Sequence, residues 1–215
     1  KPVQSKNGMV TTVCWSTNGR IDYAFEGVIV SCGATIEWLK NEMNLFTDSK
    51  ETEAMANTVT DNGGVYLVPA FSGLGSPHWD MERRASLTGI SFGTTKNHIV
   101  RAALESIPYQ IKDVIVAMEK DAGVSLQELN ADGGITSNAF VIQFLTDLLN
   151  KNVATIGMQD VSALGAAYLA GLQTGVYESI EALKKLNTNK KNHLPQADLS
   201  KVNEGYVAWQ NEINN

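Results

Sequence analysis

The stretch LNADGGITSNAFVIQFLTDLL, residues Leu129–Leu149, has the pattern of a strand, a glycine turn and a helix. A short apolar run stops at Asp132-Gly133-Gly134, and an amphipathic segment opens at Thr136-Ser137-Asn138. Adjacent glycines lack the Cβ atoms that would keep a flat ligand away from the backbone. The helix start adds unpaired N–H groups and a partial positive charge, with Thr136 or Ser137 as its expected cap. Such a turn has room for a nucleotide, although an ordinary strand-to-helix connection contains the same residues.

The remainder of the chain alternates between strand and helix patterns. The clearest helix spans 97–120, where apolar residues recur at the 3.6-residue spacing of a buried helical face. Asn18-Gly19 is a strong signal for a hairpin between two early strands. Strands are expected at 9–15, 21–26, 65–69, 85–89, 129–131 and 152–156, and further helices at 34–43, 47–59, 162–175, 180–186 and from 199 onward. This alternation predicts an α/β fold in which helices cover a mixed sheet.

Composition limits the classes of function. The chain of 215 residues, 43% of them hydrophobic, is long enough to bury the core of one domain. Its net charge of −6 argues against nucleic acid or an anionic membrane surface as a partner. No apolar run approaches the roughly 18 residues that span a bilayer. Cys14 and Cys32 lack metal-ligand spacing, and we expect both to be small buried residues in a reducing cytoplasm.

Several ordered segments resemble one protein family. The DGG turn, the small-polar-Asn triplet and the following QF–D–L helix are similar to the adenosine motif of the FGGY carbohydrate kinases, and of glycerol kinases in particular. The resemblance runs from about residue 6 to about residue 186, and several correctly spaced motifs are more specific than any one of them. The other segments that carry it are Lys6–Thr12, Tyr23–Gly27, Gly33–Leu39, Val68–Gly75 with Trp79-Asp80, Ala85–Glu105 and Ala163–Ala167.

The resemblance implies a fold and a division of the chain. The expected fold is the ribonuclease-H-like domain of the actin/hexokinase/heat-shock ATPase class, an α/β domain with a mixed sheet covered by helices. Residues 1–190 are expected to be the nucleotide-binding C-terminal domain, partial at its N-terminal end, and 191–215 a helical tail. We expect the domain to lack its first strand. That loss would expose unpaired backbone N–H and C=O groups of the neighbouring strand, together with an apolar face of the sheet.

The resemblance also implies an activity. The full-length protein is expected to be a cytoplasmic homo-oligomer that transfers the γ-phosphoryl group of MgATP to a primary hydroxyl of glycerol, giving glycerol 3-phosphate and ADP. In the family, the catalytic aspartate, the substrate site and the Mg²⁺ ligands lie in the N-terminal half of the protein, which precedes this segment. We therefore expect no catalytic residue here and no activity from this fragment alone. The alternatives are another polyol or ketose kinase, xylulokinase-like, and a non-catalytic nucleotide-binding homologue.

Five residues are the expected ATP-binding positions. Gly33 either begins a helix in the region that faces the β- and γ-phosphates in the family or is a plain helix start. Gly133 and Gly134 would admit the adenosine. Asn138 is expected either to contact the purine or ribose or to cap its helix. Glu37 stands where glycerol kinases usually have glutamine, and a carboxylate repels phosphate unless a metal or a lysine intervenes. It either binds through Mg²⁺ or water, or marks weakened use of ATP.

Other residues have two readings each. Pro108 lies inside the long helix, where a proline costs roughly 3 kcal/mol unless the helix kinks. His78 and Asp80 form either a proton relay or part of a packed structural loop. In the helix 34–43, we expect Trp38 to face the core with its apolar neighbours. Small residues along one face of the helix 162–175 indicate either a hinge between lobes or tight core packing: Ala163, Ala166, Ala167 and Ala170.

Overall fold

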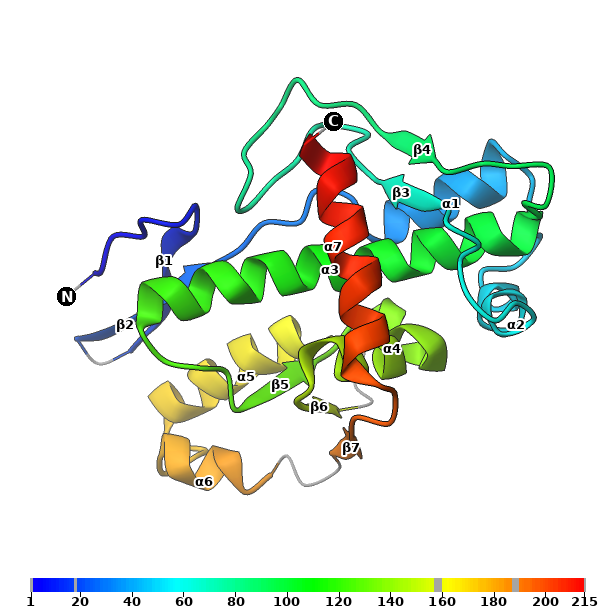
Figure 1. Cartoon of the computed structure of the whole chain (residues 1–215). Helices are drawn as coiled ribbons and strands as arrows, with labels where there is room; N and C mark the ends of the chain where they lie inside the picture. The colour runs from blue at the N-terminus through cyan, green and yellow to red at the C-terminus, as the bar shows by residue number, and fades with distance from the viewer. Residues whose placement is uncertain (1, 18, 157–159, 187–189, 215) are drawn as a thin grey trace.

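The computed structural model describes residues 2–17, 19–156, 160–186 and 190–214. One long helix, α3 (Lys96–Ala122), runs through the middle of the molecule, and the other elements pack around it (Figure 1). The remaining helices are α1 (Gly33–Asn41), α2 (Glu51–Asn57), the 3₁₀ turn η1 (Gly134–Ser137), α4 (Ala139–Leu149), α5 (Val161–Thr174), α6 (Ile180–Lys184) and α7 (Leu199–Asn214). The strands are β1 (Val10–Thr17), β2 (Arg20–Glu26), β3 (Tyr66–Val68), β4 (Ser86–Thr88), β5 (Glu128–Ala131), β6 (Asn152–Thr155) and β7 (Lys191–His193).

The described strands form three small sheets. β1 and β2 make an antiparallel hairpin, as the Asn-Gly signal predicts, although Asn18 itself lies outside the described residues. β3 pairs with β4 in an antiparallel sheet. β6 pairs in parallel with β5 and antiparallel with β7, so the third sheet is mixed. The predicted α/β architecture, with helices around a mixed sheet, is confirmed.

The apolar face predicted for the long helix is confirmed. Val100, Leu104 and Ile107 are at most 1% exposed, and Val114 is 7% exposed. Val100, Leu104 and Ile107 pack against α1, α2 and α4 in the largest hydrophobic cluster, and Val114 packs with Met9 in a separate one. Burying a side chain of this size stabilises a fold by about 1.5–3 kcal/mol. The helix runs continuously through Pro108, which is itself buried, so the proline does not end it.

The burial expected for Trp38 and for the two cysteines is wrong. Trp38 is 36% exposed, and its ring lies beside that of Phe71, with centroids 4.9 Å apart. Cys14 is exposed and falls at the register shift between Val13 and Trp15, in a two-stranded hairpin where Val13 is exposed as well. Cys32 is half-buried. The small residues of α5 are not packed in a core either, since all four are exposed: Ala163, Ala166, Ala167 and Ala170.

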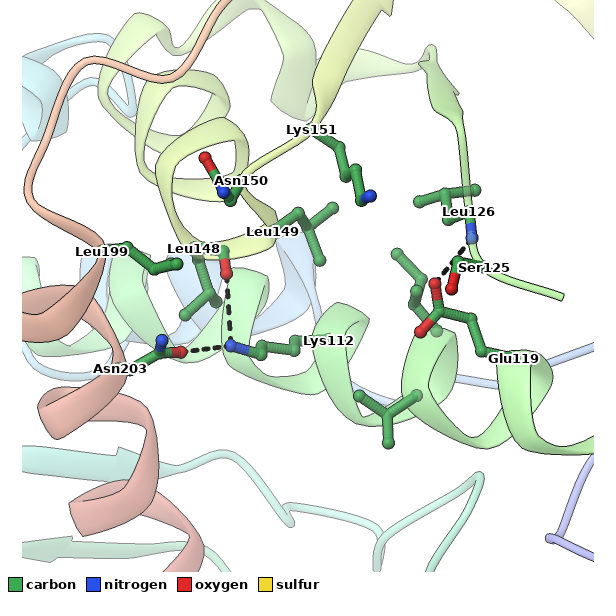
Figure 2. A pocket seen from close by; sticks show the side chains of 12 residues that line it. Lys112, Glu119, Ser125, Leu126, Leu148, Leu149, Asn150, Lys151, Leu199 and Asn203 are labelled. Atoms are coloured by element: carbon green, nitrogen blue, oxygen red, sulfur yellow. Dashed lines mark hydrogen bonds between the residues drawn. The ribbon is translucent and has the colours of Figure 1, made fainter.

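The segment predicted as a tail contributes to a core. Trp209 of α7 is 1% exposed, and its indole N–H donates to the carbonyl of Leu67 in β3 over 2.8 Å. Lys112 of α3 reaches the same helix, where its ammonium donates to Asn203 and to the carbonyl of Leu148 (Figure 2). The ammonium also lies 4.5 Å from the ring centroid of Tyr206. A positive charge at the last carbonyls of α4 is stabilising, and it ties α3, α4 and α7 together.

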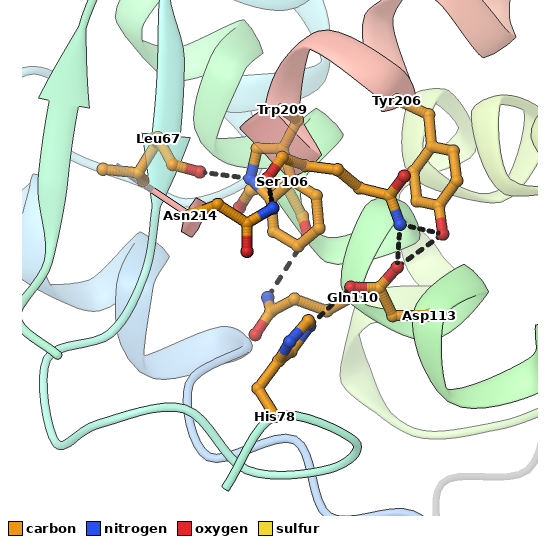
Figure 3. A network of polar contacts seen from close by, with 9 residues as sticks. Leu67, His78, Ser106, Gln110, Asp113, Tyr206, Trp209 and Asn214 are labelled. Atoms are coloured by element: carbon orange, nitrogen blue, oxygen red, sulfur yellow. Dashed lines mark hydrogen bonds and ion pairs between the residues drawn. The ribbon is translucent and has the colours of Figure 1, made fainter. Parts of the chain in front are cut away.

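Asp113 is the centre of a buried polar network (Figure 3). Its carboxylate is 4% exposed and accepts from the hydroxyl of Tyr206 and, over 2.9 Å, from the amide of Gln210. The imidazole Nε2 of His78 lies 2.7 Å from the same carboxylate. The His78–Asp80 relay is therefore wrong, because Asp80 instead accepts backbone N–H groups of its own turn. Burial raises the pKa of Tyr206, and its hydroxyl remains a donor.

The network predicts a measurable contribution of Tyr206 to stability. Tyr206→Phe removes one donor from a buried carboxylate, which costs about 1.5–3 kcal/mol because the bond is charge-assisted. The free energy of unfolding from urea denaturation should fall by that amount. Tyr23→Phe on the exposed hairpin is the matched control and should change it by less than about 0.5 kcal/mol. Equal effects of the two variants would contradict the network's role.

Candidate functional site

A pocket of about 710 Å³ lies where the starts of α1, α2 and the η1–α4 segment meet. Four of the five predicted site residues line it: Gly33, Glu37, Gly134 and Asn138. The fifth, Gly133, directly precedes η1 and has a left-handed φ of 89°. The pocket falls within the size range of small-molecule sites, which is about 300–1,000 Å³. Residues from two helices that are a hundred positions apart in the chain thus form one site.

Two glycines of the pocket are not required by the fold. At Gly33 and at Gly134, a Cβ atom would have no other atom within 4 Å, and neither residue has a left-handed φ. Packing and backbone conformation would therefore admit a side chain at both positions. The space that a side chain would fill belongs to the pocket instead. Gly133 differs, because its positive φ is a conformation that favours glycine.

Asn138 is the cap of α4. Its Oδ1 accepts from the N–H of Val141 over 3.1 Å, and its Nδ2 donates to the hydroxyl of Thr52 over 3.1 Å. The expected cap at Thr136 or Ser137 is wrong, because both hydroxyls donate back to carbonyls of the 3₁₀ turn. The Asn138 amide still has one N–H and one lone pair available to a ligand. The capping role therefore leaves room for the predicted contact with a nucleotide.

Glu37 is on the side of the pocket formed by α1. Its carboxylate is 54% exposed and lies 3.8 Å from the ammonium of Lys40, three residues along the same helix. Lys50 also lines the pocket, at the start of α2. An exposed ion pair contributes less than about 1 kcal/mol to stability. Its effect on the site is to offset part of the negative charge that Glu37 presents.

The floor of the pocket is apolar. Ile36 and Leu104 are 5% and 0% exposed, and both belong to the largest hydrophobic cluster. Ile135 and Cys32 extend this surface, and burial raises the pKa of the Cys32 thiol. An apolar floor with a polar rim suits a flat ring that carries polar substituents.

Over residues 2–17, 19–156, 160–186 and 190–214, no group of three or more His, Cys, Asp or Glu side chains is arranged to hold a metal ion. Glu53 reaches the pocket, but its carboxylate accepts the N–H of Ala139 over 2.8 Å. Within those ranges, no helix has both the length and the apolar character needed to cross a membrane.

Sequence reasoning did not identify the contribution of α2. The pattern predicts a helix over 47–59, but it contains no motif that assigns a site role to Thr52 or Glu53. Both residues lie 86 positions from their partners in the η1–α4 segment. No local signal reports a contact over that separation, so only the folded chain reveals it.

Known proteins with similar sequences and structures identify the family of this chain. The model of the FGGY family of carbohydrate kinases, C-terminal domain, matches residues 1–174. The glycerol kinase of Haemophilus influenzae is 44% identical over 213 residues, which are 99% of this chain and 42% of that protein. The chain thus spans about two fifths of the length of the curated relatives that it matches.

Solved structures give the same result. The crystal structure of Plasmodium falciparum glycerol kinase with ADP superposes with a TM-score of 0.89 at 33% identity, over 100% of this chain and 43% of that one. A ligand-bound xylulose kinase from Lactobacillus acidophilus has a TM-score of 0.82 at 20% identity, over 100% and 44%, which shows the fold alone. With its ribonuclease-H-like fold and a family match over most of its length, this chain belongs to the FGGY family of carbohydrate kinases, as a C-terminal domain.

Proposed function

We propose that this chain is the nucleotide-binding part of an ATP-dependent glycerol kinase. The observation that carries the proposal is a pair of glycines, Gly33 and Gly134. Both leave open space in the same pocket, although the fold would admit a side chain at either position. Space of this kind lets a flat base or a phosphate approach the backbone closely. The names of the relatives and the ADP in the Plasmodium structure support the same ligand.

The pocket suggests how the nucleotide lies. The adenosine rests on the apolar floor against the DGG turn, where Asn138 offers its remaining N–H. The phosphates extend toward Gly33, because the first N–H groups of α1 and its helix dipole favour negative charge. In the full-length enzyme, a base outside this chain takes the proton of the glycerol hydroxyl, whose oxygen attacks the γ-phosphorus. The bond between that phosphorus and the departing ADP breaks. Mg²⁺ accompanies the nucleotide, with its protein ligands outside the described residues.

Two other functions remain as alternatives. A xylulokinase-like ketose kinase would share the fold, but the 20% identity to that structure carries no information on substrate. The 44% identity to glycerol kinases favours glycerol. A non-catalytic nucleotide-binding homologue is suggested by Glu37, whose carboxylate faces the space where phosphates would lie. Cytoplasmic location and homo-oligomeric assembly stay predictions for the full-length protein.

An activity panel tests the proposal. The full-length protein, supplied with MgATP and with glycerol, xylulose, ribulose or gluconate in turn, should release ADP fastest with glycerol. The 215-residue chain on its own should release none in response to glycerol, because we place the catalytic base outside it. Preference for xylulose would favour the ketose kinase. Absence of turnover with every substrate, despite ATP binding, would favour the non-catalytic homologue.

Gly134→Val in the full-length protein should weaken ADP binding and leave glycerol binding unchanged. The added side chain would occupy the space assigned to the adenosine, while the fold has room for it. Calorimetry measures both affinities, and urea denaturation checks that the variant is folded. The matched control is Gly93→Val, where a Cβ also has room, at 3.7 Å from the nearest atom, Oγ of Ser91. Unchanged ADP affinity in a folded Gly134→Val variant would mean that the turn is only a connection.

Glu37→Gln should lower the KM for ATP by about a few-fold, because it removes one negative charge beside the phosphates. Lys40 offsets part of that charge already, so the gain is smaller than for an unpaired carboxylate. The control is Glu42→Gln, one residue beyond the end of α1. It also removes one carboxylate charge, but at a position outside the pocket. A rise in KM would show instead that Glu37 supports ATP through a cation.

A further inference from the structure

Two hydrogen bonds join the start of α2 to the start of α4 at the rim of the pocket. The amide of Asn138 donates to the hydroxyl of Thr52, and the N–H of Ala139 donates to the carboxylate of Glu53. All three elements around the pocket are thereby connected, since α1 and α2 already pack against the same face of α3. Each hydrogen bond joins residues that are 86 positions apart, so both bonds form only if α2 is held in place beside α4.

The other end of α2 is held on α3. The guanidinium of Arg101 donates to the carbonyls of Ala56 and Val59, over 3.2 Å and 2.6 Å. Arg101 is paired with buried Glu105 over 2.8 Å and lies over the ring of Phe140 in α4. The short helix is therefore fixed at both ends, which allows its first turn to position a neighbouring side chain.

The hydroxyl of Thr52 determines which way the Asn138 amide points. Thr52 is 1% exposed, and its hydroxyl donates its single hydrogen to the carbonyl of Ser49 over 2.6 Å. It can then only accept a hydrogen bond from Asn138. Nδ2 must face Thr52, and Oδ1 must face the N–H of Val141. The amide has no freedom to flip, and its remaining N–H and lone pair keep a fixed direction.

We propose that Thr52 is a positioning residue for nucleotide binding, which acts by fixing the amide of Asn138 at the pocket. The inference rests on the proposed function, because it assigns the nucleoside as the ligand of that amide. Glu53 supports the same arrangement. Its carboxylate accepts the N–H of Ala139 at the start of α4. That N–H is therefore not available to a phosphate, and the carboxylate repels a phosphate from this helix end. The uncharged part of the nucleotide is the part that fits there.

Thr52→Val tests the proposal, because it removes the hydroxyl and keeps the branched shape of the side chain. One hydrogen bond of this kind is worth about 0.5–1.5 kcal/mol, so ADP affinity by calorimetry should fall about 2- to 10-fold. The KM for ATP should rise to match, while glycerol affinity stays the same. Thr52→Ser restores the hydroxyl and should restore ADP affinity. Thr146→Val, at a buried threonine of α4 that bonds only within its helix, is the matched control.

A double-mutant cycle distinguishes positioning from a general structural effect. Asn138→Ser keeps a cap on α4 but removes the amide. In that background Thr52→Val should have no further effect on ADP affinity, because the Asn138 amide through which Thr52 acts is absent. Should Thr52→Val not fold, by urea denaturation, Thr52→Ala takes its place in the same cycle.

The outcomes separate this inference from the function on which it rests. If the unmodified protein binds no ADP, both fail. If it binds ADP and Thr52→Val binds as tightly, the positioning role is wrong and the nucleotide site stands. If Thr52→Val weakens ADP equally in the Asn138→Ser background, Thr52 acts by another route and the inference is overturned.

Discussion

Burial of α3 is the constraint on which the other contacts depend. Three of its polar side chains, Glu105, Gln110 and Asp113, are at most 9% exposed, and a buried polar group is costly unless it is hydrogen-bonded. Burial raises the pKa of Glu105, and its ion pair with Arg101 opposes that rise. Each group requires partners from other elements, and these are Asn62, the carbonyl of Ser31, His78, Tyr206 and Gln210. The loops and α7 are therefore located by what α3 buries.

The pocket is a consequence of the same helix. α1, α2 and α4 pack their apolar residues on one face of α3, and their polar starts are left around a common space. Leu104 of α3 is part of the pocket floor and is fully buried. A site held in this way has its shape before a ligand arrives, so binding costs little ordering of side chains. At Gly33 and Gly134, no side chain fills the space beside the backbone of this pocket.

Local features were predictable where a periodic pattern or a special residue decides the structure. The buried face of α3, the first hairpin and the glycine turn before η1 all follow from spacing and composition. Predictions failed where neighbours decide. Trp38 has an apolar spacing but is partly exposed beside Phe71, and Cys14 is exposed in a two-stranded hairpin. The cap of α4 moved to Asn138 because the 3₁₀ turn uses the earlier hydroxyls.

By itself, the sequence determined the order of the elements apart from η1 and β7, the family resemblance and the positions of the glycines in the turn and at the start of α1. These follow from properties of single residues and short spacings, which the unfolded chain already contains. Only the tertiary structure decided the partners of polar side chains. His78 pairs with Asp113 rather than with its near neighbour, and Asn138 bonds to Thr52 from a distant helix. Such pairs form because burial removes water as a competing partner and leaves each polar group only what the packing brings within reach.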